Sequence, residues 1–297
     1  MSPPSPANPR GVALSLVTVY VVWSSTYLAV RWMVGSHGAV GLPPMAMGGA
    51  RYLAAGLVLF VIARASGNPM PDRGQWLRTV PVSILFFVMG NGFVGIASRN
   101  IDSGVCAIVC GTMPLWGALI GRAFGAVVRP REWAGLLLGL SGMIALGWGA
   151  NLRADARAWS LLAIAPVAWA LGSVLVPRLS LPKGTMAAAA QMTLGGALML
   201  VLGFGFGERV PAHVPASAWL ALVYLAIFGS LAGFSAYVYL LRNARPSIAM
   251  SYAYVNPAAA VVLASVMGDA TLRATTLLST GLVVLGVVVM VTGRTKA

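Results

Sequence analysis

Ten apolar segments recur along the 297-residue chain, and they restrict its fold more than any other feature of the sequence. Each is about 20 residues or longer, which is the length that an α-helix needs to cross about 30 Å of hydrocarbon. The segments lie at 12–34, 43–65, 76–98, 103–124, 132–150, 158–177, 184–206, 217–242, 246–268 and 273–293. Charged residues make up only 9% of the chain, against about 25% in soluble domains. The sequence therefore predicts an all-α integral membrane protein with ten transmembrane helices.

The few charged residues are strongly unbalanced, with 20 Lys and Arg against 6 Asp and Glu. If the N-terminus is cytoplasmic and the segments alternate in direction, 13 basic residues fall on the cytoplasmic side, 6 fall on the opposite side, and Arg51 lies within the second segment. This bias follows the positive-inside rule. It predicts a multi-pass protein of the cytoplasmic membrane with both termini in the cytoplasm. Because the basic residues are dispersed over short loops, we expect no nucleic-acid partner, and no obligatory protein partner is evident beside the lipid bilayer.

The sequence holds no set of residues that is typical of a metal site or a catalytic centre. His37 and His213 lie alone in predicted loops, and Cys106 and Cys110 share one face of an apolar helix, where packing explains them. We therefore expect no metal and no cofactor. An intramembrane enzyme would need a nucleophile with a base, or a metal, at membrane depth, so it stays a remote alternative, as does a non-transporting structural membrane protein.

The two halves of the chain resemble each other. At an offset of 143 residues, or close to it, the matching positions are Gly90 and Gly233, Arg99-Asn100 and Arg242-Asn243, Pro114 and Pro257, Gly125 and Gly268, Trp23 and Trp169, and Gly56 and Gly196. We therefore predict a disordered cytoplasmic tail at 1–10, a first five-helix repeat at 11–150 and a second at 151–297. Because five is an odd number, the second repeat must be inverted relative to the first, an arrangement that permits alternating access.

Several runs of residues resemble the EamA-type members of the drug/metabolite transporter superfamily. They extend from Trp23 to Arg31, from Pro43 to Gly56, and from Arg242 to Pro257, followed by Gly268-Asp269 where the family usually has Gly-Glu. The first half departs from this pattern, because Ala126 follows Gly125. The resemblance implies a carrier of two EamA-like repeats that moves small metabolites or toxic compounds outward. Within the family, the branch that exports amino acids, including aromatic ones, is the most similar.

We therefore interpret the chain as a secondary transporter, not an enzyme, that exports small organic metabolites by alternating access, with amino acids, including aromatic ones, as the expected substrates. A multidrug or toxic-compound efflux carrier is the alternative. Proton-coupled multidrug carriers commonly use an acid embedded in the membrane. All six acids here fall in loops or at segment ends: Asp72, Asp102, Glu132, Asp155, Glu208 and Asp269. We expect uniport or exchange without a buried carboxylate relay.

Polar and aromatic residues within the apolar segments are the candidate substrate-binding residues. They are Trp23, Tyr27, Asn91, Trp169, Ser173, Tyr252 and Asn256. Tyr20, Trp23 and Tyr27 follow an i, i+3, i+7 spacing and share one helix face, and Trp169 and Ser173 repeat the last two positions in the second half. An aromatic wall of this kind could stack on planar solutes and bond their polar groups. Packing or anchoring at the membrane interface would produce the same pattern.

Five further residues are candidates for gating or structural roles: Arg51, Gly90, Pro114, Gly233 and Pro257. A proline leaves the carbonyl four residues earlier without its helical donor, so Pro114 and Pro257 could free carbonyls for ligand contact or bending, or cause a static kink. An unpaired charge at the depth of Arg51 costs several kcal/mol, about 3 or more. Arg51 should therefore face carbonyls or water, and it fits a pin between helices as well as a clamp for a substrate carboxylate.

Overall fold

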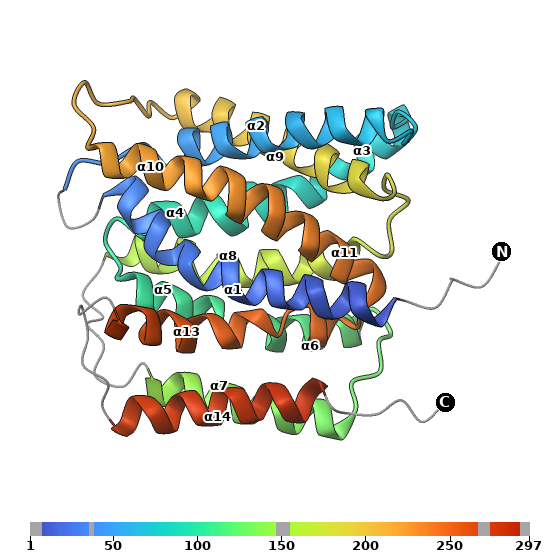
Figure 1. Cartoon of the computed structure of the whole chain (residues 1–297), viewed down its shortest axis with the longest axis vertical. Coiled ribbons are helices and arrows are strands. Elements are labelled where there is room, and N and C mark those ends of the chain that lie inside the picture. The colour runs from blue at the N-terminus through green and yellow to red at the C-terminus, as the bar shows by residue number, and fades with distance from the viewer. Residues whose placement is uncertain (1–7, 36–38, 147–154, 267–273, 292–297) are drawn as a thin grey trace.

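The computed structural model describes residues 8–35, 39–146, 155–266 and 274–291, and its regular elements in these ranges are all helices (Figure 1). In the first half they are α1 (Pro9–Val34), α2 (Pro44–Ala65), α3 (Arg73–Ser83), η1 (Ile84–Gly92), α4 (Phe93–Ala97), α5 (Ser103–Cys110), α6 (Met113–Ala123) and α7 (Pro130–Leu146). In the second half they are α8 (Ala156–Leu175), α9 (Thr185–Gly205), α10 (Ala216–Tyr224), η2 (Leu225–Phe234), α11 (Ser235–Asn243), α12 (Pro246–Ala249), α13 (Tyr252–Val266) and α14 (Ala274–Val291). Most of the predicted tail and the Gly268-Asp269 run lie outside the described residues.

The helices overlap all ten predicted segments, and seven helical runs are long and apolar enough to cross a membrane. They are Pro9–Val34, Pro44–Ala65, Arg73–Ala97, Ser103–Ala123, Ala156–Leu175, Thr185–Gly205 and Ala216–Asn243. Large apolar side chains on them face outward, as Val21 does with 69% of its surface exposed, and such a surface is favourable against lipid rather than water. The structure is therefore that of a multi-pass membrane protein. The count of ten spans stays a prediction, because α7, α13 and α14 each border residues outside the described ranges.

Helix caps place two helix starts earlier than the hydrophobic pattern predicts. The first helix begins at Pro9 rather than at residue 12, because the side chain of Asn8 accepts a hydrogen bond from the Arg10 N–H (3.1 Å) and Pro9 suits the first helical position. The third run begins at Arg73 rather than at residue 76. There Asp72 and Gln75 form a reciprocal capping box. Hydropathy does not register polar caps, so both predicted boundaries were too late.

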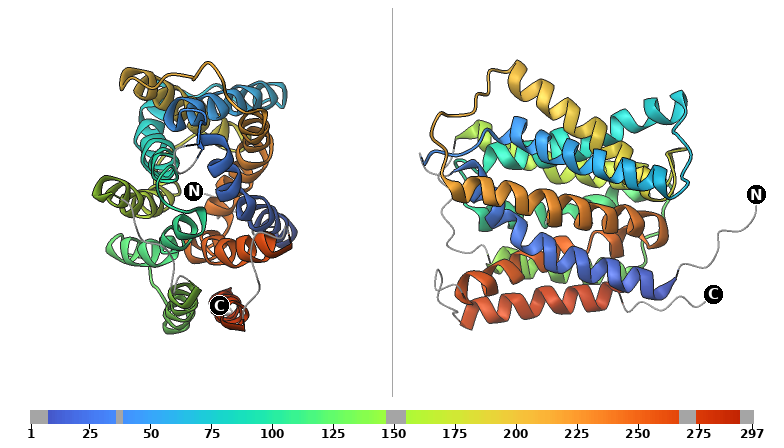
Figure 2. Two further views of the ribbon diagram at one scale, coloured as in Figure 1. Left: turned by 90° about the vertical axis from the view of Figure 1, so that its left-hand side faces the viewer. Right: turned by 45° about the horizontal axis from the view of Figure 1, so that its top comes forward.

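Equivalent helices of the two halves pair with each other and run antiparallel. Gly49 packs against the backbone of Gly196 and Leu200, and Gly139 packs against Gly286 in the same way where α7 crosses α14. Glycine lets the two backbones approach closely, as is common between membrane helices. Figures 1 and 2 place the α2–α9 pair along one edge of the molecule and the α7–α14 pair along the opposite edge, with the other helices between them.

Two features of the helices have no counterpart in the prediction. The third helical run of each half contains a π-helical segment, η1 and η2, at matching positions, and π-helical turns often occur at functional sites. The two matching prolines also differ in setting. Pro114 opens α6 after a break at Gly111-Thr112, whereas Pro257 lies inside α13.

The α2–α9 crossing can be tested with Gly196→Leu. A Cβ at this position would overlap the backbone of Gly49 and Leu53, so we expect a destabilisation of about 1–3 kcal/mol or more, measured as a lower melting temperature and a smaller monodisperse fraction in detergent. The matched control is Gly205→Leu on the same helix, where a Cβ would meet open space. Equal melting temperatures for the two variants would contradict the close crossing.

Candidate functional site

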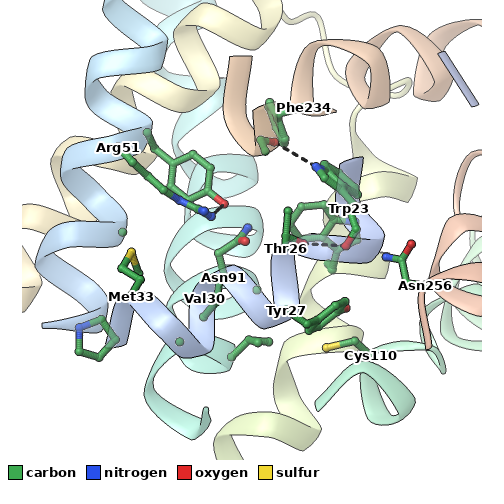
Figure 3. Close-up of a pocket in the computed structure, with 18 of the residues that line it drawn as sticks. Trp23, Thr26, Tyr27, Val30, Met33, Arg51, Asn91, Cys110, Phe234 and Asn256 are labelled. Carbon is green, nitrogen blue, oxygen red and sulfur yellow. Dashed lines mark hydrogen bonds between the residues drawn. The ribbon is translucent and has the colours of Figure 1, made fainter. Parts of the chain in front are cut away.

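A cavity of about 80 Å³ lies between the two halves of the molecule (Figure 3). Its inner end is formed by Trp23, Trp169 and Asn256, and its walls continue along α1 and α2. The other end is lined by Met33 near the end of α1 and by Pro44 at the start of α2. The cavity therefore extends from the middle of the bundle toward the end of the molecule where α1 finishes and α2 begins.

Six of the seven predicted substrate-binding residues lie in the cavity wall: Trp23, Tyr27, Asn91, Trp169, Tyr252 and Asn256. Ser173 is not among the residues that line it. Its side chain is fully buried, with the hydroxyl 2.7 Å from the Trp169 carbonyl and 2.6 Å from the Tyr237 hydroxyl. Ser173, which was predicted to match Tyr27, thus bonds the Trp169 backbone and Tyr237 instead of lining the cavity. Of the predicted gating residues, Arg51 and Gly90 line the cavity.

Each of the two equivalent tryptophans packs on a glycine of the opposite half. Trp23 covers Gly233 and Trp169 covers Gly90, and a Cβ at either glycine would overlap the indole ring. The two indoles also meet each other edge to face, with ring centroids 5.6 Å apart, a favourable aromatic geometry. The glycines are therefore needed for space, and each contact joins the first helix of one half to the π-helical segment of the other.

The indole N–H groups are hydrogen-bonded, but in different ways. Trp23 donates to the carbonyl of Gly229 in η2 (3.0 Å), and Trp169 donates to the hydroxyl of Tyr237 (3.0 Å). Each π-helical segment also contains a side-chain hydrogen bond to the carbonyl five residues earlier, from Asn91 to Phe86 (2.9 Å) and from Ser230 to Leu225 (3.1 Å). The polar groups around the tryptophans are thus largely satisfied, as buried polar groups require.

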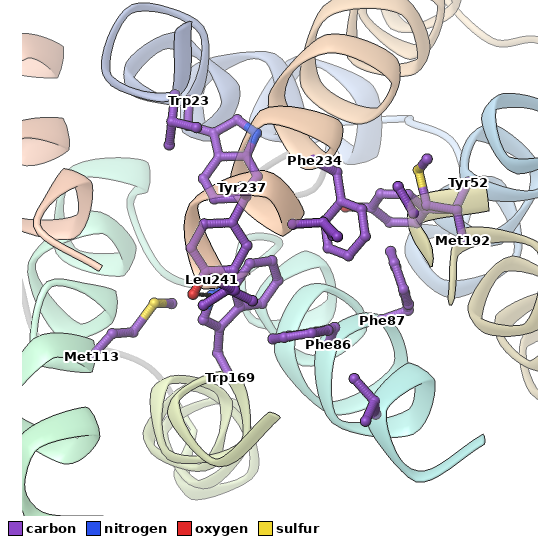
Figure 4. Packing of buried hydrophobic residues seen from close by; sticks show 14 of the residues in the cluster. Trp23, Tyr52, Phe86, Phe87, Met113, Trp169, Met192, Phe234, Tyr237 and Leu241 are labelled. Atoms are coloured by element: carbon purple, nitrogen blue, oxygen red, sulfur yellow. Dashed lines mark hydrogen bonds between the residues drawn. The ribbon is translucent and has the colours of Figure 1, made fainter. Parts of the chain in front are cut away.

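An aromatic layer closes the inner end of the cavity (Figure 4). Phe86, Phe87, Phe234 and Tyr237 are each at most 1% exposed, and they pack on Trp169 and on one another with ring centroids 4.8 to 6.5 Å apart. Sequence reasoning did not single out Phe86, Phe234 or Tyr237, although Tyr237 lies one helical turn after the predicted Gly233. The layer meets the cavity at Trp169 and Phe234, which belong to the cavity wall.

Two polar side chains of the cavity wall keep unpaired donors. Asn256 accepts a hydrogen bond from the Ser24 hydroxyl (3.2 Å), while its Nδ2 has no partner in the described part of the chain. The guanidinium of Arg51 lies over the Tyr52 ring, with Cζ 4.2 Å from the ring centroid, and Nη2 donates to the Tyr52 hydroxyl. Its Nε and Nη1 have no partner among the described residues. The cavity therefore presents donors and a positive charge.

The acidic side chains serve helix ends rather than the cavity. Asp72 and Asp155 cap helices, Glu132 pairs with Arg245 (2.8 Å), and Glu208 accepts hydrogen bonds from the N–H groups of Met45 and Ala46 (3.2 and 2.6 Å) at the start of α2. No acidic residue lines the cavity as far as the chain is described. The described residues likewise contain no group of three metal-ligating side chains.

A bundle of long apolar helices that encloses a partly polar cavity between two similar halves is the architecture of a polytopic membrane transporter. The model of the EamA-like transporter family matches the chain twice, at residues 11–148 and 157–292. The chain therefore belongs to the EamA-like transporter family, within the drug/metabolite transporters, and it is not an enzyme.

Two relatives support the same assignment, and one solved structure shares the fold. The uncharacterized inner membrane transporter YedA of Escherichia coli K12 is 37% identical over 94% of this chain and 90% of its own. The probable terminal-alkyne amino-acid exporter of Streptantibioticus cattleyicolor is 27% identical over 85% of this chain and 84% of its own. One solved structure shares the fold with a TM-score of 0.77 at 23% identity, covering 96% of this chain and 97% of that one.

The hydrogen bonds of the Tyr237 hydroxyl to Trp169 and Ser173 can be tested with Tyr237→Phe. The substitution keeps the ring but removes the hydroxyl that meets both Trp169 and Ser173, so we expect a loss of about 1 kcal/mol of stability, seen in thermal unfolding, together with a changed emission of the Trp169 indole. Tyr239→Phe on the same helix is the control, because Tyr239 does not belong to the aromatic layer or to the buried core around it. A Tyr237→Phe protein as stable as the control would show that this bond network contributes nothing.

Proposed function

We propose that the protein is a secondary transporter of the cytoplasmic membrane that exports small organic metabolites, with amino acids, including aromatic ones, as its substrates. The observation that carries the proposal is the cavity that ends at Trp23 and Trp169, in which aromatic faces and unpaired donors line the same space. Such a lining suits a solute with a planar apolar part and hydrogen-bond acceptors. The similarity to a protein named as an inner membrane transporter and to one named as an amino-acid exporter supports it.

We infer that the transport cycle uses ten helices in two inverted five-helix repeats. The antiparallel pairing of α2 with α9 and of α7 with α14 supports this arrangement, and so does the exchange of Trp–Gly contacts between the halves. If both termini are cytoplasmic, α1 ends on the outer side, so the cavity opens outward and the aromatic layer closes the cytoplasmic side. Exchange of the two halves' conformations would then open the opposite side.

Binding must widen the cavity. Its volume of about 80 Å³ is below the range of about 300–1,000 Å³ that is typical of pockets for drug-sized ligands. The Trp–Gly contacts are where the halves can move, because flat rings that rest on glycine backbone can slide without meeting a side chain. A large multidrug ligand is less well accommodated than a single amino acid, and a cationic drug would meet Arg51 without an acidic counter-charge.

Counterflow in proteoliposomes with a panel of labelled amino acids tests the substrate class. We expect exchange of aromatic amino acids by the wild-type protein and a reduction of about tenfold or more in Trp23→Ala and Asn256→Ala, which equals about 1.4 kcal/mol of lost interaction. Trp32→Ala is the matched control, because Trp32 lies on the same helix with 48% of its surface exposed. Flux of cationic drugs without flux of any amino acid would favour the multidrug alternative.

The coupling can be tested in the same vesicles. Because the acids that the structure describes lie at helix ends and outside the cavity, we expect counterflow to proceed without an imposed pH gradient and to persist in Asp72→Asn and Glu132→Gln proteins that remain folded. Transport that strictly requires a pH gradient, and that one acid substitution abolishes, would refute transport without a carboxylate relay.

A further inference from the structure

Arg51 is the one basic side chain in the described cavity wall. It makes few hydrogen bonds for a charged side chain that is buried within a membrane-spanning helix. Only 7% of its surface is exposed. Its hydrogen bond joins Nη2 to the hydroxyl of the next residue, Tyr52, and its Nε and Nη1 have no partner in the described chain. A buried guanidinium with two unused donor positions is costly in a membrane. The Arg51 side chain therefore keeps two donor atoms in the cavity wall that make no hydrogen bond within the described structure.

Other arginines of the chain show what a structural pin looks like. Arg178 donates to the carbonyls of Val174 (2.6 Å) and Phe124 (3.3 Å), and Arg242 donates to that of Pro182 (2.6 Å). Arg178, just after the end of α8, thus joins α8 to the segment after α6, and Arg242 of α11 joins its helix to the segment before α9. Arg51 makes no such bond to another helix in the described structure, so pinning α2 to its neighbours does not explain it.

The neighbours of Arg51 orient it toward the cavity. The Tyr52 ring lies beneath the guanidinium at 4.2 Å and the Tyr52 hydroxyl holds Nη2, an arrangement that fixes the plane of the group. Figure 3 shows its nitrogen atoms directed into the space that Asn91 also faces. Nε and Nη1 lie on different edges of the guanidinium, so each edge keeps an unused donor for a planar anion. Carboxylates match such an edge in both geometry and charge.

We propose that Arg51 is the site that binds the carboxylate of the transported solute, with Tyr52 as the residue that positions it. This inference rests on the proposed function and names the chemical group by which the solute is recognised. Because no acid lines the described cavity, an ammonium group has no matching charge there. The carboxylate is therefore the recognised group, and the site accepts aromatic carboxylates with or without an amino group, while it rejects the corresponding neutral amides.

The experiment compares four probes on the full-length protein in nanodiscs and proteoliposomes: L-phenylalanine, L-phenylalaninamide, 3-phenylpropanoate and 3-phenylpropanamide. Binding is followed by tryptophan fluorescence and transport by counterflow. For the wild-type protein we expect both acids to bind and exchange, and both amides to bind at least about tenfold more weakly, the factor that 1.4 kcal/mol represents. Arg51→Gln should remove this preference, and Arg51→Lys should keep part of it, because a lysine retains the charge but not the planar edge.

The control is Arg178→Gln, which removes a structural arginine and should lower stability without changing the preference of acid over amide. The wild-type comparison needs no variant, so it tests the proposal even if Arg51→Gln does not fold. Equal binding and exchange of acids and amides by the wild-type protein would overturn the Arg51 site but leave the transport function standing. If none of the four probes bound or exchanged, this result would overturn both the Arg51 site and the proposal that aromatic amino acids are substrates.

Discussion

The packing of two tryptophans on two glycines is the contact on which the rest of the site depends. Trp23 of α1 rests on Gly233 and Trp169 of α8 rests on Gly90, so each half of the chain supplies a ring to the other half and receives one from it. The same indoles form the inner end of the cavity. Because an indole can lie this close to a helix only where the residue has no Cβ, the two glycines allow the close approach of the halves.

The charges of the molecule are arranged around this apolar centre. Asp72 and Asp155 cap helices, and Glu208 holds the first N–H groups of α2, so these acids stabilise helix ends near the membrane surfaces. Arg51 is the exception, because it places a positive charge against the cavity with donors unused. A transporter needs polar groups with unused hydrogen-bonding capacity in its cavity, because a group whose hydrogen bonds are all made within the protein has none left for a solute.

Hydropathy and internal similarity predict the helical segments and the six wall residues, because both depend on local composition and on spacing along one helix face. They could not predict the π-helical segments, which result from one extra residue in a turn and leave the hydrophobic pattern unchanged. The hydroxyl of Tyr237 behind Trp169 was missed for a different reason: it meets Ser173 across 64 positions of sequence. Whether Arg51 is a pin or a binding residue likewise depends on what its neighbours leave unpaired, which only the packed structure describes.

Distance measurements between spin labels at the two ends of the molecule test the alternating exchange of the halves most directly. With Cys106 and Cys110 replaced by alanine, one label pair at Gly104 and Ala216 would span the end where the cavity opens, and another at Arg73 and Lys183 would span the closed end. We predict opposite changes when L-phenylalanine is added, with the first distance population shifting shorter and the second longer. Distances that change together at both ends, or that stay fixed in a labelled protein that still transports, would contradict the account.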